Sequence, residues 1–171
     1  EVWGGRPPSS RPKKAEPCDL NPGWRPGGRL EKLAIRGSEN DGLLIYGQAH
    51  LEELQVSGNR WNGLEVRGSG QVSLQDSTVS HNESVGLVVY GSARVTLQDS
   101  IVSKNKENGL FVVGEAHVEL TNTTIRNNTW WGIAACLEKC GYGTDDFKGK
   151  VLWEGRGNEI YDKGKGAVCL P

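Results

Sequence analysis

Short runs of alternating apolar and polar residues follow one another along most of the chain, separated by glycine, asparagine, serine and aspartate. The segment 72–94 shows this pattern most completely. Alternation over about four to eight residues is typical of a half-buried β-strand, whose side chains point to opposite faces in turn. We therefore predict three short strands in this segment, joined by bends at the turn-forming residues. The positions expected to point inward are Val72, Leu74, Val79, Leu87 and Val89.

The pattern recurs with a fixed period, marked by a turn of the form Asn-x-x-x-Gly-Leu or Asn-x-x-x-Gly-Ile. The asparagines of this turn are 23 residues apart, at Asn59, Asn82, Asn105 and Asn128. One further turn glycine, Gly42, lies 21 residues before Gly63. A period of about 20 to 50 residues is the signature of a solenoid.

Equivalent residues of stacked coils should form ladders, because neighbouring strands lie about 4.8 Å apart. We predict a buried ladder of the four turn asparagines, whose amides hydrogen-bond from coil to coil and satisfy the backbone at the bend. An aliphatic ladder is expected in the core, formed by Leu43, Leu64, Leu87, Leu110 and Ile133. Small residues are expected to mark one tight corner, at Ala49, Gly70, Ala93 and Ala116.

Two other solenoids fit the sequence less well. The segment 51–59 matches the leucine-rich-repeat template L-x-x-L-x-L-x-x-N. The second half of such a repeat should be helical, whereas here it reads Gly-Leu-x-Val-x-Gly, which breaks helices twice and alternates like a strand. The six-residue rhythm of a left-handed hexapeptide helix is not visible.

The repeat closely resembles that of the right-handed parallel β-helix proteins, the pectin-lyase-like superfamily, from about Leu30 to Ile133. The segment from Cys140-Gly-Tyr to Val-Cys-Leu-Pro171 looks like the C-terminal cap of secreted bacterial members. The resemblance implies an all-β fold, a right-handed parallel β-helix (solenoid) of about six coils with an extended N-terminal tail. We expect a tail over 1–29, coils over 30–140, and a C-terminal coil and cap over 141–171. The activity stays open, because this superfamily includes lyases, hydrolases, epimerases, adhesins and structural rods.

Composition narrows the cellular setting. Four cysteines in a β-rich chain favour an oxidising compartment, and the cysteine and histidine spacings match no zinc site. The chain begins at Glu1 and contains no methionine, which fits a mature chain whose signal peptide has been removed. We therefore expect a secreted or cell-surface protein. The net charge of −1 gives no argument for a nucleic-acid partner, and no apolar run is long enough to span a membrane.

Residues 1–29 differ from the coils, since they hold six of the seven prolines and predict an extended tail. The outward positions of the Gly-Leu-x-Val-x-Gly strands are mainly apolar, and a contiguous exposed apolar stripe marks a contact surface. We predict that residues 1–17 cover this stripe, either on their own rod or on a neighbouring subunit. The stripe, which is also the candidate assembly face, consists of Leu44, Tyr46, Val88, Tyr90, Phe111 and Val113.

Paired acidic residues are the first candidates for chemistry. Asp76 and Asp99 occupy equivalent positions on adjacent coils, close enough to repel or to share a cation. The third member of this ladder is Asn122, and we expect the earlier coils to lack the position. Because Ser77 and Ser100 follow directly, we interpret the aspartates as residues that cap a bend.

The three histidines are scattered along the sequence. His50 and His117 are assigned the repeat position of Gln71 and Arg94, which is outward and solvated. We therefore expect no catalytic residue, no metal site and no cofactor.

Exposed aromatic residues are a better candidate for ligand binding. Trp61, Trp130 and Trp131 lie in the turn that follows the ladder asparagine, where they would stack on sugar rings or pack over the flank of the rod. Of the three Asn-x-Ser/Thr sequons, the one at Asn82 is expected to be buried in the ladder. Asn122 and Asn127 are expected at exposed positions and are the candidates for glycosylation.

Four cysteines allow three disulfide pairings. We predict a Cys140–Cys169 bridge, because it would pin the irregular last coil. The remaining Cys18 and Cys136 allow a bridge within one chain or between subunits. We favour the bridge between subunits, because it would lock a polymer covalently.

Two functions follow from these observations as hypotheses. The first is a non-enzymatic, secreted structural subunit that assembles with copies of itself into an extracellular filament, sheath or surface layer. The open strand edges at the ends of a β-helix favour such pairing. The alternative is a carbohydrate-binding or carbohydrate-processing β-helix module, with a polysaccharide as its partner.

Overall fold

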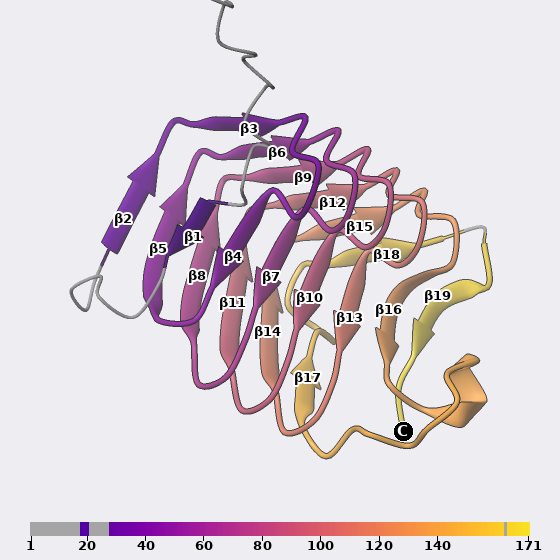
Figure 1. Ribbon diagram of the computed structural model, residues 1–171. Helices are drawn as coiled ribbons and strands as arrows, with labels where there is room; N and C mark the ends of the chain where they lie inside the picture. The colour runs from indigo at the N-terminus through magenta and orange to yellow at the C-terminus, as the bar shows by residue number, and fades with distance from the viewer. Residues whose placement is uncertain (1–17, 21–27, 163) are drawn as a thin grey trace, which may run out of the picture.

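The computed structural model describes residues 18–20, 28–162 and 164–171, with side chains from residue 28 onward. These residues form three parallel sheets that run the length of one rod (Figure 1). Sheet A holds, in spatial order, β1 (Cys18–Leu20), β4 (Leu43–Ile45), β7 (Leu64–Val66), β10 (Leu87–Val89), β13 (Leu110–Val112), β16 (Trp131–Ala135) and β19 (Gly166–Cys169).

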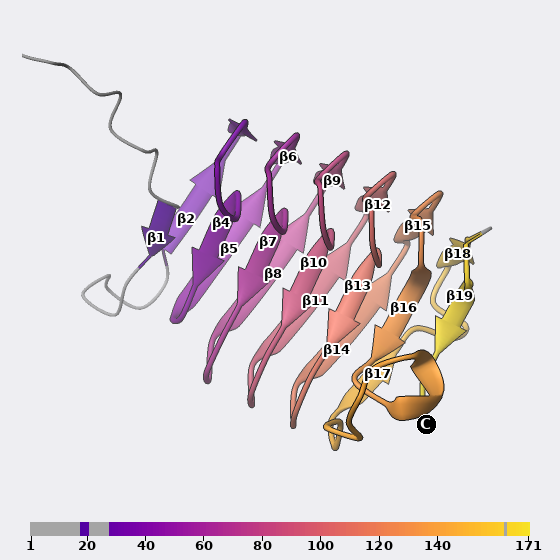
Figure 2. The ribbon, with the colours of Figure 1, turned by 45° about the vertical axis from the view of Figure 1, so that its right-hand side comes forward.

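Each coil passes through sheet B, sheet C and sheet A in turn, and the coils stack side by side along one axis (Figure 2). Sheet B consists of β2 (Gly28–Glu31), β5 (Gln48–Glu52), β8 (Gln71–Gln75), β11 (Arg94–Gln98), β14 (His117–Thr121) and β17 (Lys150–Leu152). Sheet C consists of β3 (Ala34–Arg36), β6 (Gln55–Ser57), β9 (Thr78–Ser80), β12 (Ile101–Ser103), β15 (Thr124–Arg126) and β18 (Glu159–Tyr161). The predicted parallel β-solenoid, with three strands per coil, is confirmed.

The core is a set of aliphatic ladders. The predicted ladder from Leu43 to Ile133 runs along sheet A in the expected register, and its five side chains are at most 1% exposed. The predicted inward positions of the segment 72–94 are also buried. Burial of a Val, Leu or Ile side chain contributes about 1.5–3 kcal/mol, so repeated burial from coil to coil stabilises the rod.

The asparagine ladder is confirmed as well. The Nδ2 of each ladder asparagine donates to the Oδ1 of the next, at 2.9 Å from Asn59 to Asn82, 3.0 Å from Asn82 to Asn105 and 2.9 Å from Asn105 to Asn128. Each of these Oδ1 atoms also accepts the backbone N–H of the preceding asparagine. All four side chains are at most 3% exposed, so a polar column runs through the core with its hydrogen bonds satisfied.

The ladder ends at a residue that the repeat did not predict. Asp162 accepts the backbone N–H of Asn128 at Oδ1 and its Nδ2 at Oδ2, the latter at 3.0 Å. Because a carboxylate only accepts hydrogen bonds, this end of the ladder has no amide hydrogen left to satisfy.

The glycine of the repeated turn is required by the asparagine of the next coil. A Cβ added at Gly86 would lie 2.6 Å from the Nδ2 of Asn105 and 2.7 Å from the carbonyl oxygen of Gly109. The turn glycines of the two adjacent coils, Gly63 and Gly109, have equivalent neighbours: the ladder asparagine and the turn glycine of the coil that follows each of them. The repeated Asn-x-x-x-Gly turn therefore needs its glycine because two coils approach each other closely at this point.

The register of the first coils differs from the prediction. Ala49 pairs with Val72, and the corner position of Gly70 is matched by Gly47, whose carbonyl oxygen accepts the N–H of Gln71. The physical reason is a shorter corner between sheets A and B. The first coil turns this corner with Gly47 alone, whereas the next coil uses Gly-Ser-Gly at 68–70, with Gly68 at φ 66°. The 21-residue spacing results from this difference of two residues.

Two segments at the ends of the rod refine the expected boundaries. Cys18–Leu20 form β1 within the region expected to be a tail, pairing with β4. The expected contacts of residues 1–17 with the stripe lie outside the described residues. At the other end, β17, β18 and β19 complete the last coil, as expected for 141–171.

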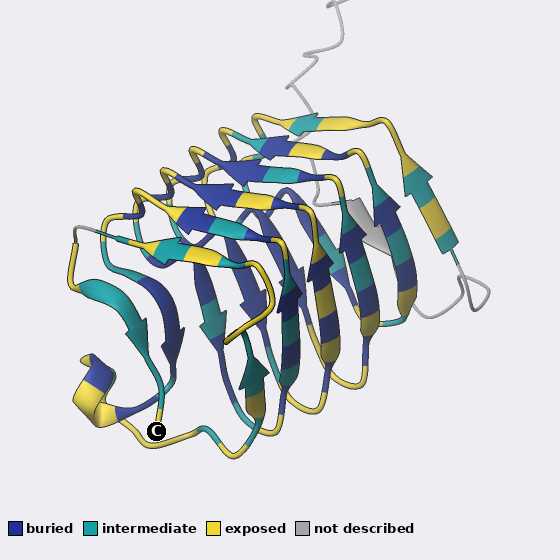
Figure 3. Cartoon of the chain, turned by 180° about the vertical axis from the view of Figure 1, so that it is seen from behind, coloured by how far each residue is buried: buried dark blue, intermediate teal, exposed yellow. Residues whose placement is uncertain are grey.

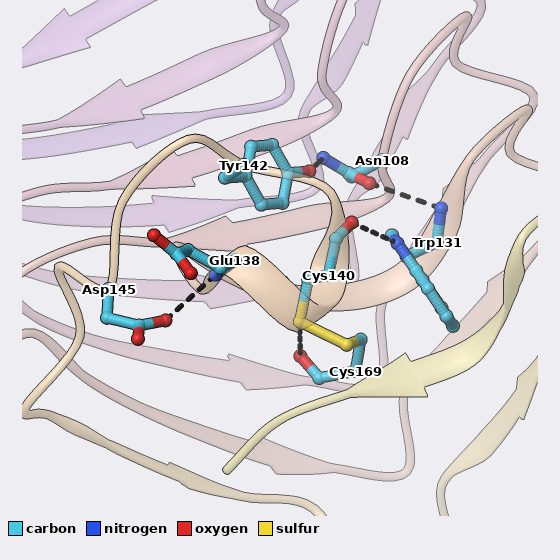
Figure 4. Close-up of a disulfide and its surroundings, with 7 residues drawn as sticks. All are labelled: Asn108, Trp131, Glu138, Cys140, Tyr142, Asp145 and Cys169. Atoms are coloured by element: carbon cyan, nitrogen blue, oxygen red, sulfur yellow. Dashed lines mark hydrogen bonds between the residues drawn. A yellow bond between two sulfur atoms is a disulfide. The ribbon is translucent and has the colours of Figure 1, made fainter.

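A loop over residues 137–149, here called the strap, leaves β16 and contains the short 3₁₀ helix η1 (Glu138–Cys140). The predicted disulfide joins Cys140 to Cys169 of β19, with their Cα atoms 5.8 Å apart (Figure 4). The indole N–H of Trp131 donates to the Cys140 carbonyl oxygen at 3.0 Å, and the N–H of Glu138 donates to Oδ1 of Asp145 at 2.8 Å. The strap is thus fixed to the end of sheet A.

The ladder makes a stability prediction. Replacing Asn105 by Leu should lower the free energy of unfolding by about 1–3 kcal/mol, because buried donors of Asn82 lose their acceptor. Urea unfolding measures the change. The matched control is Lys106→Leu at the next, exposed position, which should change stability by less than about 0.5 kcal/mol. Equal effects of the two substitutions would contradict the ladder's role.

Candidate functional site

The outer face of sheet B carries a groove of about 670 Å³. Along the strands of this sheet, buried residues alternate with intermediate or exposed ones (Figure 3). The residues between the buried positions line the groove. One row of groove residues, the first row, consists of Gln48, Gln71, Arg94, His117 and Lys150. A parallel second row consists of His50, Ser73, Thr96, Glu119 and Leu152.

Some charged side chains of the groove have an ion-pair partner and others do not. Among the described residues, Arg94 and Lys150 take part in no ion pair, whereas Glu119 is paired with Arg156. Most other members of the two rows are neutral donors and acceptors of hydrogen bonds. The groove therefore presents polar groups with an excess of positive charge.

A chain of polar contacts lies at the N-terminal part of the second row. The His50 Nδ1 is hydrogen-bonded to the Ser73 hydroxyl across adjacent strands β5 and β8. The His50 Nε2 lies 4.0 Å from Oε2 of Glu52, two residues along β5. Arg29 of β2 contacts the same Glu52 carboxylate from the preceding coil. Serine, histidine and glutamate are thus aligned on one face.

The predicted position of His50 was wrong. It shares its row with Ser73 and Glu119, not with Gln71, since the short first corner shifts the register by two residues. His117 does share a row with Gln71 and Arg94, as expected. The sequence signal that would have found the His50–Ser73 pair is their spacing of 23 residues, equal to the repeat.

Asp76 and Asp99 lie at the exposed corner between sheets B and C, with φ values of 49° and 50°. The expectation that earlier coils lack this position was wrong. The left-handed conformation of this corner occurs once per coil, at Lys32, Glu53, Asp76, Asp99 and Asn122. The following serines cap the bend as predicted: the Ser77 hydroxyl donates to the Gln75 carbonyl oxygen at 2.6 Å, and Ser100 Oγ accepts the N–H of Ser77 at 3.1 Å. The aspartates belong to a structural corner.

The predicted apolar stripe on sheet A is not a continuous exposed surface. Val88 and Val113 are only 2% and 8% exposed, and the stripe is interrupted by the buried Glu65. The ring of Tyr142 in the strap covers Phe111, with ring centroids 4.5 Å apart. The Asn108 amide donates a hydrogen bond to the Tyr142 hydroxyl (Figure 4). The strap therefore covers part of the expected assembly face in cis.

The uncovered part of the stripe surrounds a polar cluster. Leu44 is half-buried, Tyr46 is 38% exposed, and the Arg67 guanidinium lies 5.6 Å from the ring centroid of Tyr90. Arg67 also pairs with the Glu65 carboxylate. An apolar contact surface at this place is therefore not supported.

Asn62 connects two carboxylates in this cluster. Its N–H donates to Oδ1 of Asp41 at 3.0 Å, and its Nδ2 donates to Oε2 of Glu65 at 2.9 Å. Burial raises the pKa of Asp41 above its ordinary value, and the nearby negative charge of Glu65 raises the pKa further. Burial likewise raises the pKa of Tyr90, and that of Tyr142 in the strap to about 12.

The three tryptophans have different environments. Trp61 is 58% exposed and remains a candidate for stacking on a sugar ring. Trp130 is covered by Lys165, whose Nζ lies 4.2 Å from the ring centroid. The indole N–H of Trp131 is bonded to the strap. The second and third tryptophans therefore pack against the molecule's own C-terminal segments, and none of the three lines the groove.

The candidate glycosylation sites are exposed as predicted, and Asn82 is buried. Asn122 and Asn127 have φ values of 47° and 57° and occupy two successive left-handed corners. Asparagine tolerates this conformation better than most residues. Their presence at these corners has a structural reason independent of glycosylation.

The remaining cysteines are far apart. Cys18 pairs in register with Leu43 at one end of sheet A, and Cys136 follows β16 five strands away, a separation of about 24 Å. A disulfide needs Cα atoms within about 7 Å, so a bridge within one chain is excluded. An in-register, end-to-end stack of two chains would still leave these Cα atoms about 14 Å apart. The proposed covalent lock therefore does not fit that arrangement, and Cys136 is a free thiol.

Among the described residues, no group of three or more His, Cys, Asp or Glu side chains is arranged to hold a metal ion. No helix there is long and apolar enough to cross a membrane.

Comparison with known proteins identifies the repeat. The family model described as a right handed beta helix region matches residues 24–167, most of the chain. Comparisons with curated proteins and with solved structures gave no match.

The buried carboxylate of Asp41 makes a pH prediction. Because its pKa is raised in the folded protein, folding favours the protonated form, so stability falls as pH rises from its ordinary value of 3.8 through the raised value. Asp41→Asn keeps an oxygen that accepts the Asn62 N–H and removes the ionisation. Unfolding free energies measured from about pH 3 to 7 should therefore decline less with pH in the variant. Parallel pH profiles would show that Asp41 ionises equally easily in both states.

Proposed function

The chain belongs to the right-handed β-helix family, and from this fold and the groove on sheet B we propose that it binds an extended carbohydrate chain. The ligand lies along the axis of the rod, across β5, β8, β11 and β14. The main support for this proposal is the pair of rows on sheet B, in which each row contributes one side chain from every coil along the groove.

Geometry supports this class of ligand. Strand spacing gives the rows a repeat of about 4.8 Å, close to the length of one sugar ring in an extended glycan. The volume of the groove is within the range of about 300–1,000 Å³ of ligand pockets. Gln48, Gln71 and Arg94 offer donors and acceptors suited to hydroxyl groups.

A second proposal, self-assembly into an extracellular filament, sheath or surface layer, has one specific observation in its favour. In the part of the chain described, no strand pairs with the outer edges of β17, β18 and β19. Core residues of this last coil are only partly buried, namely Val151, Trp153, Ile160, Val168 and Leu170. An unpaired edge with apolar residues behind it favours pairing with a second copy. The stripe and the cysteine lock, by contrast, do not support this assembly.

Both proposals place the protein outside the cell or on its surface. The support is the Cys140–Cys169 disulfide, since such bonds persist in oxidising compartments. Neither binding nor assembly by itself requires a chemical step.

Groove variants test the first proposal. Gln71→Ala and Arg94→Ala should each weaken binding of a polysaccharide selected on a glycan array by about tenfold, because each removes a hydrogen bond to the ligand. Titration calorimetry measures the dissociation constants. The matched control is Trp61→Ala, which removes the exposed aromatic residue outside the groove. Loss of binding in this control alone would move the site to the turn and contradict the groove.

Mass in solution tests the second proposal. The single chain has a mass of 18.6 kDa, and self-assembly predicts species of several times that mass that grow with protein concentration. Analytical ultracentrifugation over a wide concentration range measures this. A single species of one chain mass throughout would contradict assembly and leave the carbohydrate proposal intact.

A further inference from the structure

The groove on sheet B contains a nucleophile next to a base. The Ser73 hydroxyl is hydrogen-bonded to Nδ1 of His50, and the second ring nitrogen of His50 faces the Glu52 carboxylate at 4.0 Å. A nucleophile bonded to a base, with the base oriented by a third group, is the arrangement used for covalent catalysis. Ser73 and His50 both line the groove, so a ligand bound there can reach them.

The two ring nitrogens of His50 have different neighbours, and this arrangement suits the role of a base. Glu52 favours the tautomer with the proton on Nε2, which leaves the Nδ1 lone pair to accept the Ser73 proton. Arg29 forms an ion pair with the same carboxylate from the preceding coil. Contacts between catalytic groups are often long without substrate, so 4.0 Å is compatible with an orienting role for Glu52.

We infer that the groove catalyses acyl transfer from ester-substituted carbohydrate, with Ser73 as nucleophile and His50 as general base. The Ser73 Oγ forms a bond to the acyl carbon of an ester R–CO–OR′ while His50 takes its proton. The C–OR′ bond breaks, and R′O⁻ leaves as the alcohol R′OH with the proton from His50. Water then attacks the Ser73 ester with His50 again as base, releasing the carboxylic acid and restoring the serine.

Charge develops on the acyl oxygen during this step and needs donors nearby. The backbone N–H groups along these strands are used within the sheet, so side chains must supply them. Gln71 lies two residues before Ser73 on the same face, and Arg94 is paired with Gln71 in the next coil. Arg94, which has no carboxylate partner among the described residues, is the group placed to stabilise this charge.

This inference rests on the carbohydrate-binding proposal for its natural substrate class, but its chemistry is tested separately. A small ester has no glycan chain, so its turnover does not depend on glycan affinity. Glycan binding without ester turnover would support the carbohydrate-binding proposal and contradict the catalytic one. Ester turnover without glycan binding would support the catalytic step and contradict the carbohydrate-binding proposal.

The experiment uses the full chain, a fluorophosphonate probe and 4-nitrophenyl acetate. Mass spectrometry should locate the probe on Ser73, and Ser73→Ala should abolish both labelling and turnover. His50→Ala should reduce turnover by about 10²–10⁴-fold, the usual contribution of a general base. Added imidazole should restore part of the activity of the His50 variant, an effect that a merely structural histidine would not show.

The chain offers a matched control in its second histidine–serine contact. His81 Nδ1 lies 3.1 Å from the Ser80 hydroxyl, outside the groove and without a carboxylate partner in the described residues. Ser80→Ala and His81→Asn should therefore label and turn over like the parent. Circular dichroism checks that all variants fold. No label on Ser73 in the parent protein, or equal labelling in His50→Ala, overturns the inference.

Discussion

The structure depends on the hydrogen bonds that each coil makes with the next. No strand of the described rod has a partner within its own coil, so the backbone of the strands is satisfied by stacking. The asparagine ladder extends this dependence into the bends, where each amide bonds both the backbone and the side chain of the preceding coil. This dependence explains the 23-residue repeat of the sequence, because a change in one coil must be matched in its neighbours.

The same constraint leaves the outer faces free to vary. On sheet A the outer face is occupied by the strap and by the cluster around Glu65 and Asn62. Sheet B, by contrast, holds an open groove with polar rows. A ligand site in this fold therefore comes from side chains that the ladders do not require, and the His50–Ser73 pair is one such set.

The fold was largely predictable because a ladder residue has few alternatives. The asparagines and the aliphatic ladder were placed in their observed register, and so was the Cys140–Cys169 bridge. Ala49 and His50 were assigned to the wrong register, because the first coil is two residues shorter than the next one. The sequence alone does not show whether the missing residues lie before or after these two positions. The strap and the terminal Asp162 were missed, since they lie outside the repeat and depend on contacts across about 34 residues of sequence. The first row of the groove was expected to be outward at Gln71, Arg94 and His117, whereas the His50–Ser73 pair was missed because it depends on the register of His50.

We propose that the ligand contacts lie on the open face of sheet B. A crystal structure of the protein with an oligosaccharide bound would test this proposal. We expect ligand density along the groove, with successive sugar rings beside Ser73, Arg94 and His117. Density stacked on Trp61, with the groove holding only solvent, would contradict it.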